Sequence, residues 1–263
     1  MKSQKTSLLG PDPQGLTQAA ELLAAGQLVA FPTETVYGLG GDARNDRAVA
    51  AIFEAKGRPQ FNPLIVHVAD IQAARQIAVF DDTAERLASA FWPGALTLVL
   101  PVQPDAGLSF LVMAGLDTVA VRVPEHPVAQ GLLAAFGGPI AAPSANPSGK
   151  ISPTRAHHVI EGLSGRIAAV VDGGPCEVGL DSTIVATSPQ PVLLRPGGIP
   201  AEALEACLGM SLGVSGNAAK PTAPGQLASH DAPSARLRLN VATPAPGEIF
   251  LGFDHTAQDP ALN

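Results

Sequence analysis

The sequence predicts an α/β fold, an open twisted sheet with helices packed outside it. Short apolar runs of strand length alternate along the chain with longer segments whose apolar residues recur at helical spacing. Hydrophobic residues make up 46% of the composition and charged residues 15%, as in a compact globular protein. The 263 residues suffice for one large or two modest domains with a sizeable core.

Strands are expected at apolar, often β-branched runs that stop at proline, glycine or polar residues. Pro32 ends the first run because proline has no N–H to give to a sheet. The other runs are bounded in similar ways. The predicted strands are 28–31, 64–68, 95–100, 118–123, 140–142, 167–171, 182–186 and 192–194.

Helices are expected where apolar residues recur every three or four positions. The segment 16–25 fits this spacing and ends at Gly26, because glycine is common just after a helix. Pro11 and Pro13 are expected to keep residues 1–15 irregular. The other predicted helices are 46–55, 71–78, 83–90, 127–136, 201–208 and a segment after Thr154.

Charge and cysteine content argue against several classes of protein. The formal net charge is −7, whereas a large nucleic-acid surface is normally basic. No apolar run reaches the roughly 18 residues that span a bilayer, and the first residues lack the apolar core of a signal peptide. Cys176 and Cys207 offer neither a C-x-x-C motif nor zinc-ligand spacing. We expect a cytoplasmic protein with no membrane partner and no protein-bound metal.

The stretch from residue 31 to residue 68 contains most of the candidate functional groups. Thr33, Glu34 and Thr35 follow the first predicted strand directly, and open α/β sheets bind ligands at the carboxyl ends of their strands. Three glycines then allow positive φ or a close approach of the backbone to a bound group. These are Gly38, Gly40 and Gly41.

A basic pair and a histidine complete this stretch. Lys56 and Arg58 lie at the end of a predicted helix, and His67 lies inside the next strand. Each alone is explained by a structural role, because single polar residues near turns usually satisfy the backbone. Several such groups on loops between rigid strands favour a functional site. Because arginine suits carboxylate and phosphate, we predict a local anion pocket.

Two later segments also indicate anion binding. Arg122 interrupts a β-branched strand and needs an anionic partner if it is buried, which either a structural carboxylate or a ligand would supply. Residues 143–154 combine small hydroxyl, amide and glycine residues, the composition of a phosphate cradle. This segment is not a Walker A loop, because Ile151 follows Lys150.

A dinucleotide-binding enzyme is a weaker alternative. The segment from Gly38 to Ala43 fits the loose G-x-G-x-x-G/A pattern. That pattern should follow its strand directly and open a helix, whereas residues 32–37 intervene here. A nicotinamide or flavin enzyme is therefore disfavoured.

Four motifs stand out along the chain. They are Phe31-Pro-Thr-Glu-Thr-Val-Tyr-Gly-Leu-Gly40, Lys56-Gly-Arg58-Pro-x-x-Asn62-Pro-Leu-Ile-Val-His67, Ala142-Pro-Ser-Ala-Asn-Pro-Ser-Gly149 and Asp181-Ser-Thr-Ile-Val185. Together they resemble the Sua5/YrdC/YciO family of threonylcarbamoyl-AMP synthases. The resemblance covers about residues 15–233 and implies a large YrdC-like sheet with both parallel and antiparallel neighbours.

The resemblance implies a nucleotidyltransferase that joins L-threonine, bicarbonate or CO2 and ATP into threonylcarbamoyl-AMP and pyrophosphate. The product serves the N6-threonylcarbamoyl modification of adenosine 37 in tRNA, which it reaches through downstream transfer proteins. Mg2+ is expected to bind mainly through ATP oxygens. No covalent enzyme intermediate is needed, so catalysis would depend on positioning and charge neutralisation.

The resemblance also implies roles for individual residues. Lys56, Arg58, Ser144 and Asn146 match the signature tetrad expected to grip phosphate. We expect Lys56→Ala or Arg58→Ala to abolish pyrophosphate release and to leave the fold intact. The positions resembling the threonine site are Thr35, His67, Arg122, Ala142 and Ser182. The positions resembling the ATP site are Arg58, Asn62, Thr118, Ser144, Ser152, Arg195 and Asp231.

The resemblance further predicts three parts of the chain. Residues 1–208 form the catalytic domain, 209–233 a linker folding over the active site, and 234–263 the truncated start of a Rossmann-like C-terminal domain. Asp231 stands where the family usually has tyrosine. Its carboxylate would tend to repel phosphate, so we expect a weaker lid and weaker ATP retention.

Two alternatives share the fold but not the activity. An RNA-binding YciO-like protein without synthase activity is possible, although the acidic composition disfavours it. A carbamoyl-adenylate module of hydrogenase-maturation carbamoyltransferases is disfavoured, because their acylphosphatase-like and zinc-finger segments have no counterpart in this sequence.

Overall fold

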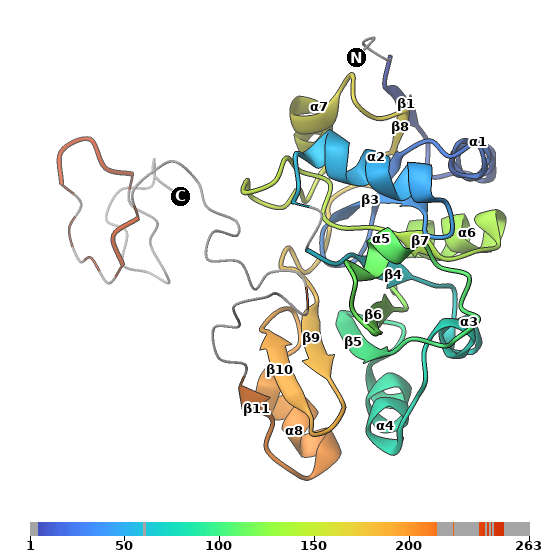
Figure 1. The fold of residues 1–263 in the computed structure, drawn as a ribbon. Coiled ribbons are helices and arrows are strands. Elements are labelled where there is room, and N and C mark those ends of the chain that lie inside the picture. Colours follow the sequence, from blue (N-terminus) through green and yellow to red (C-terminus); the bar gives the residue numbers. More distant parts are fainter. Residues whose placement is uncertain are drawn as a thin grey trace. The chain divides into compact units, whose positions relative to one another are not determined.

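The structure is a computed structural model that describes residues 5–59 and 62–214, together with 223, 237–239, 241, 243 and 245–249. Figure 1 shows strands running through the middle of the domain with helices on both sides. The strands are β1 (Ser7–Leu9), β2 (Val29–Pro32), β3 (Tyr37–Asp42), β4 (Ile65–His67), β5 (Leu96–Pro101), β6 (Thr118–Arg122), β7 (Ile140–Ala141), β8 (Ala169–Val171), β9 (Thr183–Ala186), β10 (Val192–Arg195) and β11 (Gly213–Val214). The helices are α1 (Pro13–Ala24), α2 (Asp46–Lys56), α3 (Ile71–Ile77), α4 (Asp82–Phe91), α5 (Phe110–Met113), α6 (Pro127–Phe136), α7 (Ala156–Leu163) and α8 (Ala201–Leu208).

Among the described residues, eleven strands form one sheet, in the order β1-β8-β2-β3-β7-β4-β6-β5-β9-β10-β11. Parallel and antiparallel neighbours both occur. The strand β6, for example, pairs parallel with β4 on one side and antiparallel with β5 on the other. The predicted α/β architecture with a mixed open sheet is confirmed.

The prediction for the N-terminus was wrong. Residues 7–9 form β1, which pairs parallel with β8, and α1 begins at Pro13. The side chain of Asp12 caps this helix by accepting a hydrogen bond of 3.0 Å from the backbone N of Gly15. Pro13 lies in the first turn, where its missing N–H costs nothing, so it starts the helix and does not prevent it.

The glycine-rich residues 37–42 form β3, a strand that was not predicted, so the expected positive φ was wrong, whereas the alternative of a close backbone approach to a bound group stays a prediction. None of the three glycines there has positive φ. They make room for neighbouring side chains: a Cβ on Gly40 would lie 2.8 Å from Cε1 of Phe31 and 3.0 Å from Cγ2 of Ile140. Glycine is required in β3 for packing within the fold.

We expect Gly40→Ala to lower the free energy of unfolding by about 1–3 kcal/mol, the usual cost of overpacking a core. Phe31 and Ile140 are fully buried, so neither side chain can move aside into solvent. Urea denaturation of the two proteins measures this change. Equal free energies of unfolding for the two proteins would mean that the strands on either side of β3 can move apart to accommodate the added methyl group without loss of stability.

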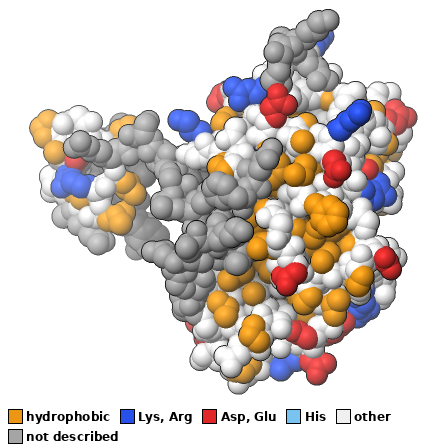
Figure 2. All heavy atoms as spheres, in the orientation of Figure 1, with side chains coloured by type: hydrophobic (Ala, Val, Ile, Leu, Met, Phe, Trp, Pro, Cys, Tyr) orange, Lys and Arg blue, Asp and Glu red, His pale blue; other side chains and the backbone are white. Residues whose placement is uncertain are grey.

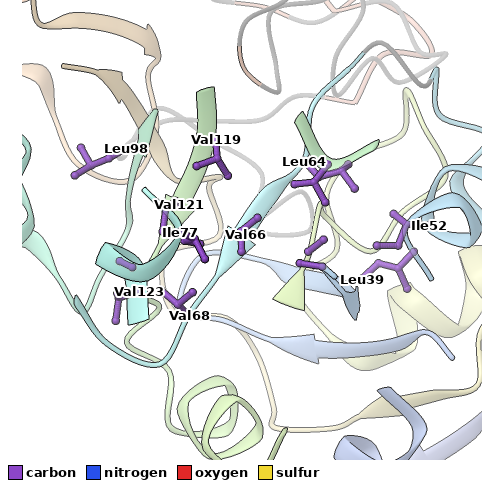
Figure 3. Packing of buried hydrophobic residues seen from close by; sticks show 14 of the residues in the cluster. Leu39, Ile52, Leu64, Val66, Val68, Ile77, Leu98, Val119, Val121 and Val123 are labelled. Carbon is purple, nitrogen blue, oxygen red and sulfur yellow. The ribbon is translucent and has the colours of Figure 1, made fainter. Parts of the chain in front are cut away.

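The two faces of the sheet pack differently because side chains alternate along each strand. On one face, Val66 and Val121 belong to a large cluster that includes residues of α2, α3, α4, α5, α7 and α8, part of which is shown in Figure 3. On the other face, Phe31 packs against α1 and α6. Further along this second face, Ile65 and Ala120 belong to a smaller cluster that includes no helical residue.

The chain divides into two compact units, residues 1–232 and 233–263. In the first unit, β11 extends the sheet into the range predicted as linker, and Ala223 is fully buried in the smaller cluster. In the second unit, Arg238 and Glu248 form an ion pair of 2.5 Å. Asp231 and most of the predicted linker lie outside the described residues. None of the described helices has the length and apolar character needed to cross a membrane.

Candidate active site

Strand alternation places the candidate residues on the second face of the sheet. The strands β4 and β6 are parallel neighbours, and His67 stands opposite Arg122. Because Val66 packs on the first face, the ring of His67 lies on the second, where its centroid is 6.3 Å from that of Phe31. The cluster beside it consists of strand residues and Ala223 and, among the described residues, contains no helical residue.

A hollow of about 450 Å³, counting its open mouth, lies at this position. All five residues that resemble the threonine site line it, and so do Arg58, Ser144 and Arg195 from the predicted ATP site. Segments far apart in the sequence therefore meet here. The lining residues are Thr33, Thr35, Val36, Gly38, Arg58, Ile65, His67, Arg122, Ala142, Pro143, Ser144, Asp181, Ser182 and Arg195.

Arg122 is held in one orientation at one end of the hollow. An arginine has five N–H groups, and three are used: Nε donates to Gly94 O at 3.1 Å, and the two terminal nitrogens donate to Thr35 Oγ1 at 2.9 Å and Glu34 Oε1 at 2.5 Å. The structure thus supplies the structural carboxylate that Arg122 requires. The other two N–H groups have no partner among the described residues and are available to a carboxylate ligand.

His67 is uncharged at neutral pH. It is 3% exposed, and burial together with the nearby charge of Arg122 lowers its pKa from 6.5 to about 3. Its Nδ1 is buried and has no hydrogen-bond partner among the described residues. A neutral imidazole nitrogen facing the hollow can hydrogen-bond a ligand without adding charge.

We expect His67 to make the fold less stable in acid. Below about pH 6.5 His67 is protonated in the unfolded chain, whereas in the folded protein it stays neutral down to about pH 3. The free energy of unfolding therefore falls as the pH falls through this range. Between about pH 7.5 and about pH 5.5 the loss due to this residue is about 1.4 kcal/mol. Urea denaturation at both pH values measures it. In His67→Gln the loss of stability between these pH values should be smaller than in the wild type by this amount. An equal loss in both proteins would contradict the lowered pKa of His67.

Arg58 and Arg195 form the cationic end of the hollow. Arg58 donates to the carbonyl oxygens of Asn62 at 3.3 Å and Pro63 at 2.9 Å, and it has no ion pair among the described residues. Burial and repulsion by Arg195 lower the pKa of Arg58 to about 10. Two cations this close favour binding of an anion between them.

Arg195 is tied to the β9 strand through several bonds. Nε and one terminal nitrogen donate to Ser182 O at 3.1 and 2.9 Å, and the other terminal nitrogen pairs with Asp181 Oδ2 at 3.3 Å. Ser182 is fixed in turn, because its hydroxyl lies 2.7 Å from that of Thr97 on β5. This network aims the guanidinium of Arg195 at the hollow.

Lys56 and Asn146 lie beside the hollow and do not line it. The Nζ atom of Lys56 donates to Ser144 O at 2.5 Å, Asn146 O at 2.6 Å and Asn146 Oδ1 at 3.2 Å. Lys56 is 3% exposed, so it joins the end of α2 to the loop that carries Ser144. This position argues against the expectation that its replacement leaves the fold intact.

The remaining predicted ATP residues occupy three settings. Asn62 is 2% exposed, and its Oδ1 is buried without a partner among the described residues, so it is suited to accept a bond from a ligand. Thr118 lies at the start of β6, on the same face as Arg122 by strand alternation. Ser152 is half-buried in the loop before α7. Asp231 lies outside the described residues.

The resemblance assigned no role to two acidic residues of the site, although Glu34 stood among the candidate groups after the first predicted strand. Glu34 pairs with Arg122 and Asp181 pairs with Arg195. Both stand inside the motifs that marked the site, next to predicted residues. Their proximity to buried arginines, which no sequence pattern reports, is what identifies them.

Comparison with known proteins shows the family. The family model described as "Telomere recombination", which comprises Sua5, YciO and YrdC, matches residues 21–197. This chain belongs to the Sua5/YciO/YrdC family. It is 53% identical over 238 residues to the threonylcarbamoyl-AMP synthase of Bacillus subtilis, covering 89% of this chain and 68% of that protein. It is 49% identical over 227 residues to the threonylcarbamoyl-AMP synthase of Pyrococcus abyssi, covering 83% and 66%.

A solved structure from the same family agrees with the fold. The structure of P. abyssi Sua5 complexed with L-threonine matches with a TM-score of 0.84 and 45% sequence identity, covering 88% of this chain and 70% of that one. Overall, the chain spans about two thirds of the length of the Sua5 relatives it matches.

Proposed function

We propose that this chain is an L-threonylcarbamoyladenylate synthase, which makes threonylcarbamoyl-AMP and pyrophosphate from L-threonine, bicarbonate or CO2, and ATP. The observation that carries the proposal is the convergence of Arg58, Arg122 and Arg195, from three separate segments, in one hollow. The identity to proteins named threonylcarbamoyl-AMP synthase supports it and favours it over an RNA-binding protein of the same fold.

The two ends of the hollow suit the two larger substrates. At one end, the N–H groups of Arg122 that have no partner among the described residues would bind the threonine carboxylate, and Thr35 and His67 offer neutral polar groups. Ser182, which accepts hydrogen bonds from Arg195, would reach threonine from the other end. At the other end, Arg58 and Arg195 would hold the triphosphate. Ser144, inside the motif at residues 142–149, also lines the hollow and would bind the same phosphate chain.

The reaction then requires no nucleophile from the protein. The threonine amine attacks CO2 and loses a proton to give a carbamate, and a carbamate oxygen attacks the α-phosphorus of ATP. The bond from that phosphorus to the bridging oxygen breaks, and pyrophosphate leaves with the electron pair. Arg58 and Arg195 neutralise the charge that moves onto pyrophosphate, and the fixed geometry lowers the entropic cost.

Magnesium would enter as part of the nucleotide substrate. Within the part of the chain that the structure describes, no three His, Cys, Asp or Glu side chains are grouped to hold a metal. Asp181, which lines the hollow, is the acidic side chain best placed to contact a metal carried by ATP.

We further propose that the protein works in the cytoplasm and supplies its product to tRNA through separate transfer proteins. On the face in Figure 2, Lys and Arg side chains are scattered among Asp and Glu around a central group of hydrophobic side chains. Such an arrangement does not favour direct tRNA binding there.

One assay tests these statements together. Pyrophosphate release from ATP is measured with and without threonine and bicarbonate, beside a tRNA titration at two salt concentrations. We expect release that requires both threonine and bicarbonate, and weak tRNA binding. Tight, salt-sensitive tRNA binding without threonine-dependent release would instead support the RNA-binding alternative.

A further inference from the structure

Two groups of charged side chains line or flank the hollow, one around Arg122 and one around Arg58 and Arg195, and under the proposed function they are its threonine end and its phosphate end. The two ends differ in charge. At the threonine end, Arg122 and Glu34 form an ion pair of 2.5 Å whose side chains are 4% and 7% exposed. The imidazole of His67 adds no charge there. At the phosphate end, Asp181 is the partner of Arg195, whereas Arg58 has no ion pair among the described residues. These side chains therefore sum to zero charge at the first end and to one positive charge at the second, and Lys56, bonded to the loop that carries Ser144, adds a further positive charge beside the second end.

The carboxylate of Glu34 is fixed in place. Its Oε1 accepts from Arg122, and its Oε2 accepts from the backbone N of Glu125 at 3.1 Å. The turn that carries it is also anchored, because the backbone N of Val178 donates to Glu34 O at 2.8 Å and that of Gly179 donates to Thr35 O at 3.1 Å. Glu34 lies 6% exposed behind Arg122 and is absent from the residues that line the hollow.

This placement gives Glu34 an effect on binding without direct contact. Threonine is a zwitterion with no net charge, whereas the phosphates of ATP and pyrophosphate are multiply negative. Charge is felt strongly at a buried site because screening by water is weak. A buried arginine left without Glu34 would attract any polyphosphate that reached it.

We propose that Glu34 is a specificity-determining residue that cancels the charge of Arg122, so that the threonine end accepts the zwitterion and rejects polyphosphate. This inference rests on the proposed function. It assigns the two substrates to their ends by net charge, and it gives the buried carboxylate a role in positioning and selection beyond stabilising the fold.

The test measures threonine binding by calorimetry, with and without inorganic pyrophosphate. In the wild-type protein we expect pyrophosphate to leave threonine affinity unchanged. In Glu34→Gln the end becomes cationic, so threonine affinity falls about tenfold and added pyrophosphate competes with threonine. Glu34→Asp keeps the charge and should show no such competition, even where threonine binds more weakly. Glu85→Gln is the control, because Glu85 forms an exposed ion pair with Arg75 and should behave as wild type.

Each outcome decides the inference. The inference would be overturned by a folded Glu34→Gln protein whose affinity for threonine is unchanged by added pyrophosphate. Competition between pyrophosphate and threonine in Glu34→Asp or in the wild type would overturn it as well. Should Glu34→Gln fail to fold, the wild-type and Glu34→Asp titrations still decide. A wild-type protein that binds neither threonine nor pyrophosphate would refute the proposed function itself, which separates the two failures.

Discussion

Replacing Arg58 with methionine is expected to reduce threonine-dependent pyrophosphate release by a factor of about 100 to 1,000, the usual effect of removing a group that stabilises charge in the transition state. Arg58 lines the hollow beside Arg195 and is the arginine there without an ion pair among the described residues. Its positive charge is therefore available to the phosphates. The KM for ATP should rise more than the KM for threonine.

The same substitution should hardly change stability. The charge of Arg58 is buried and repelled by Arg195, so its removal relieves an unfavourable interaction. The two lost hydrogen bonds to Asn62 O and Pro63 O offset this gain, which leaves the free energy of unfolding within about 1 kcal/mol of wild type. Calorimetric unfolding and a pyrophosphate-release assay measure the two effects. Arg75→Met, at an exposed ion pair, is the control and should change neither.

Near-normal turnover of Arg58→Met would show that Arg58 does not contribute to the phosphate site. A large loss of stability would have a different meaning. It would show that the bonds from Arg58 to the loop at Asn62 and Pro63 hold the fold together, and that the loss of activity is secondary.

Strands and helices with regular patterns could be predicted from the sequence alone. The strand β6 and the helix α6 appear at or within one residue of their expected bounds, because buried β-branched runs and a proline at a first helical turn are local signals. The strand β3 could not be predicted in this way. Glycines are usually unfavourable in strands, and only their tertiary neighbours explain them: Phe31 and Ile140 on adjacent strands crowd Gly40, and Leu28 and Ile52 crowd Gly41.

The residues that belong to the site could be predicted better than the contacts between them. Eight of the residues predicted from the resemblance line the hollow, and six of these stand in the four motifs, whereas Arg122 and Arg195 stand outside them. The partner of Arg122 remained open between a structural acid and a ligand. Glu34, on another strand connection, resolves that choice, since contacts between residues so far apart in sequence depend on the register of the whole sheet.

The contacts of Lys56 change what its replacement should do. Its Nζ binds three oxygens of the loop at Ser144 and Asn146, and the backbone N of Ser148 donates to Lys56 O at 2.8 Å. Lys56→Met keeps the apolar stem but leaves buried carbonyl oxygens without this donor. We expect the free energy of unfolding to fall by about 2–4 kcal/mol. Activity should fall as well, because Ser144 lines the hollow and loses its support.

Comparison of Lys56→Met with Arg58→Met separates two ways of losing activity. Both lose turnover, but only Lys56→Met should lower the melting temperature in the absence of substrates. Arg75→Met is again the control, because Arg75 lies in an exposed ion pair outside the site and its replacement should affect neither quantity. A Lys56→Met protein with wild-type stability and greatly reduced turnover would contradict the structural role. It would mean that the ammonium group leaves the loop to bind phosphate during the reaction, because only a contact made with the substrates could then account for the lost activity.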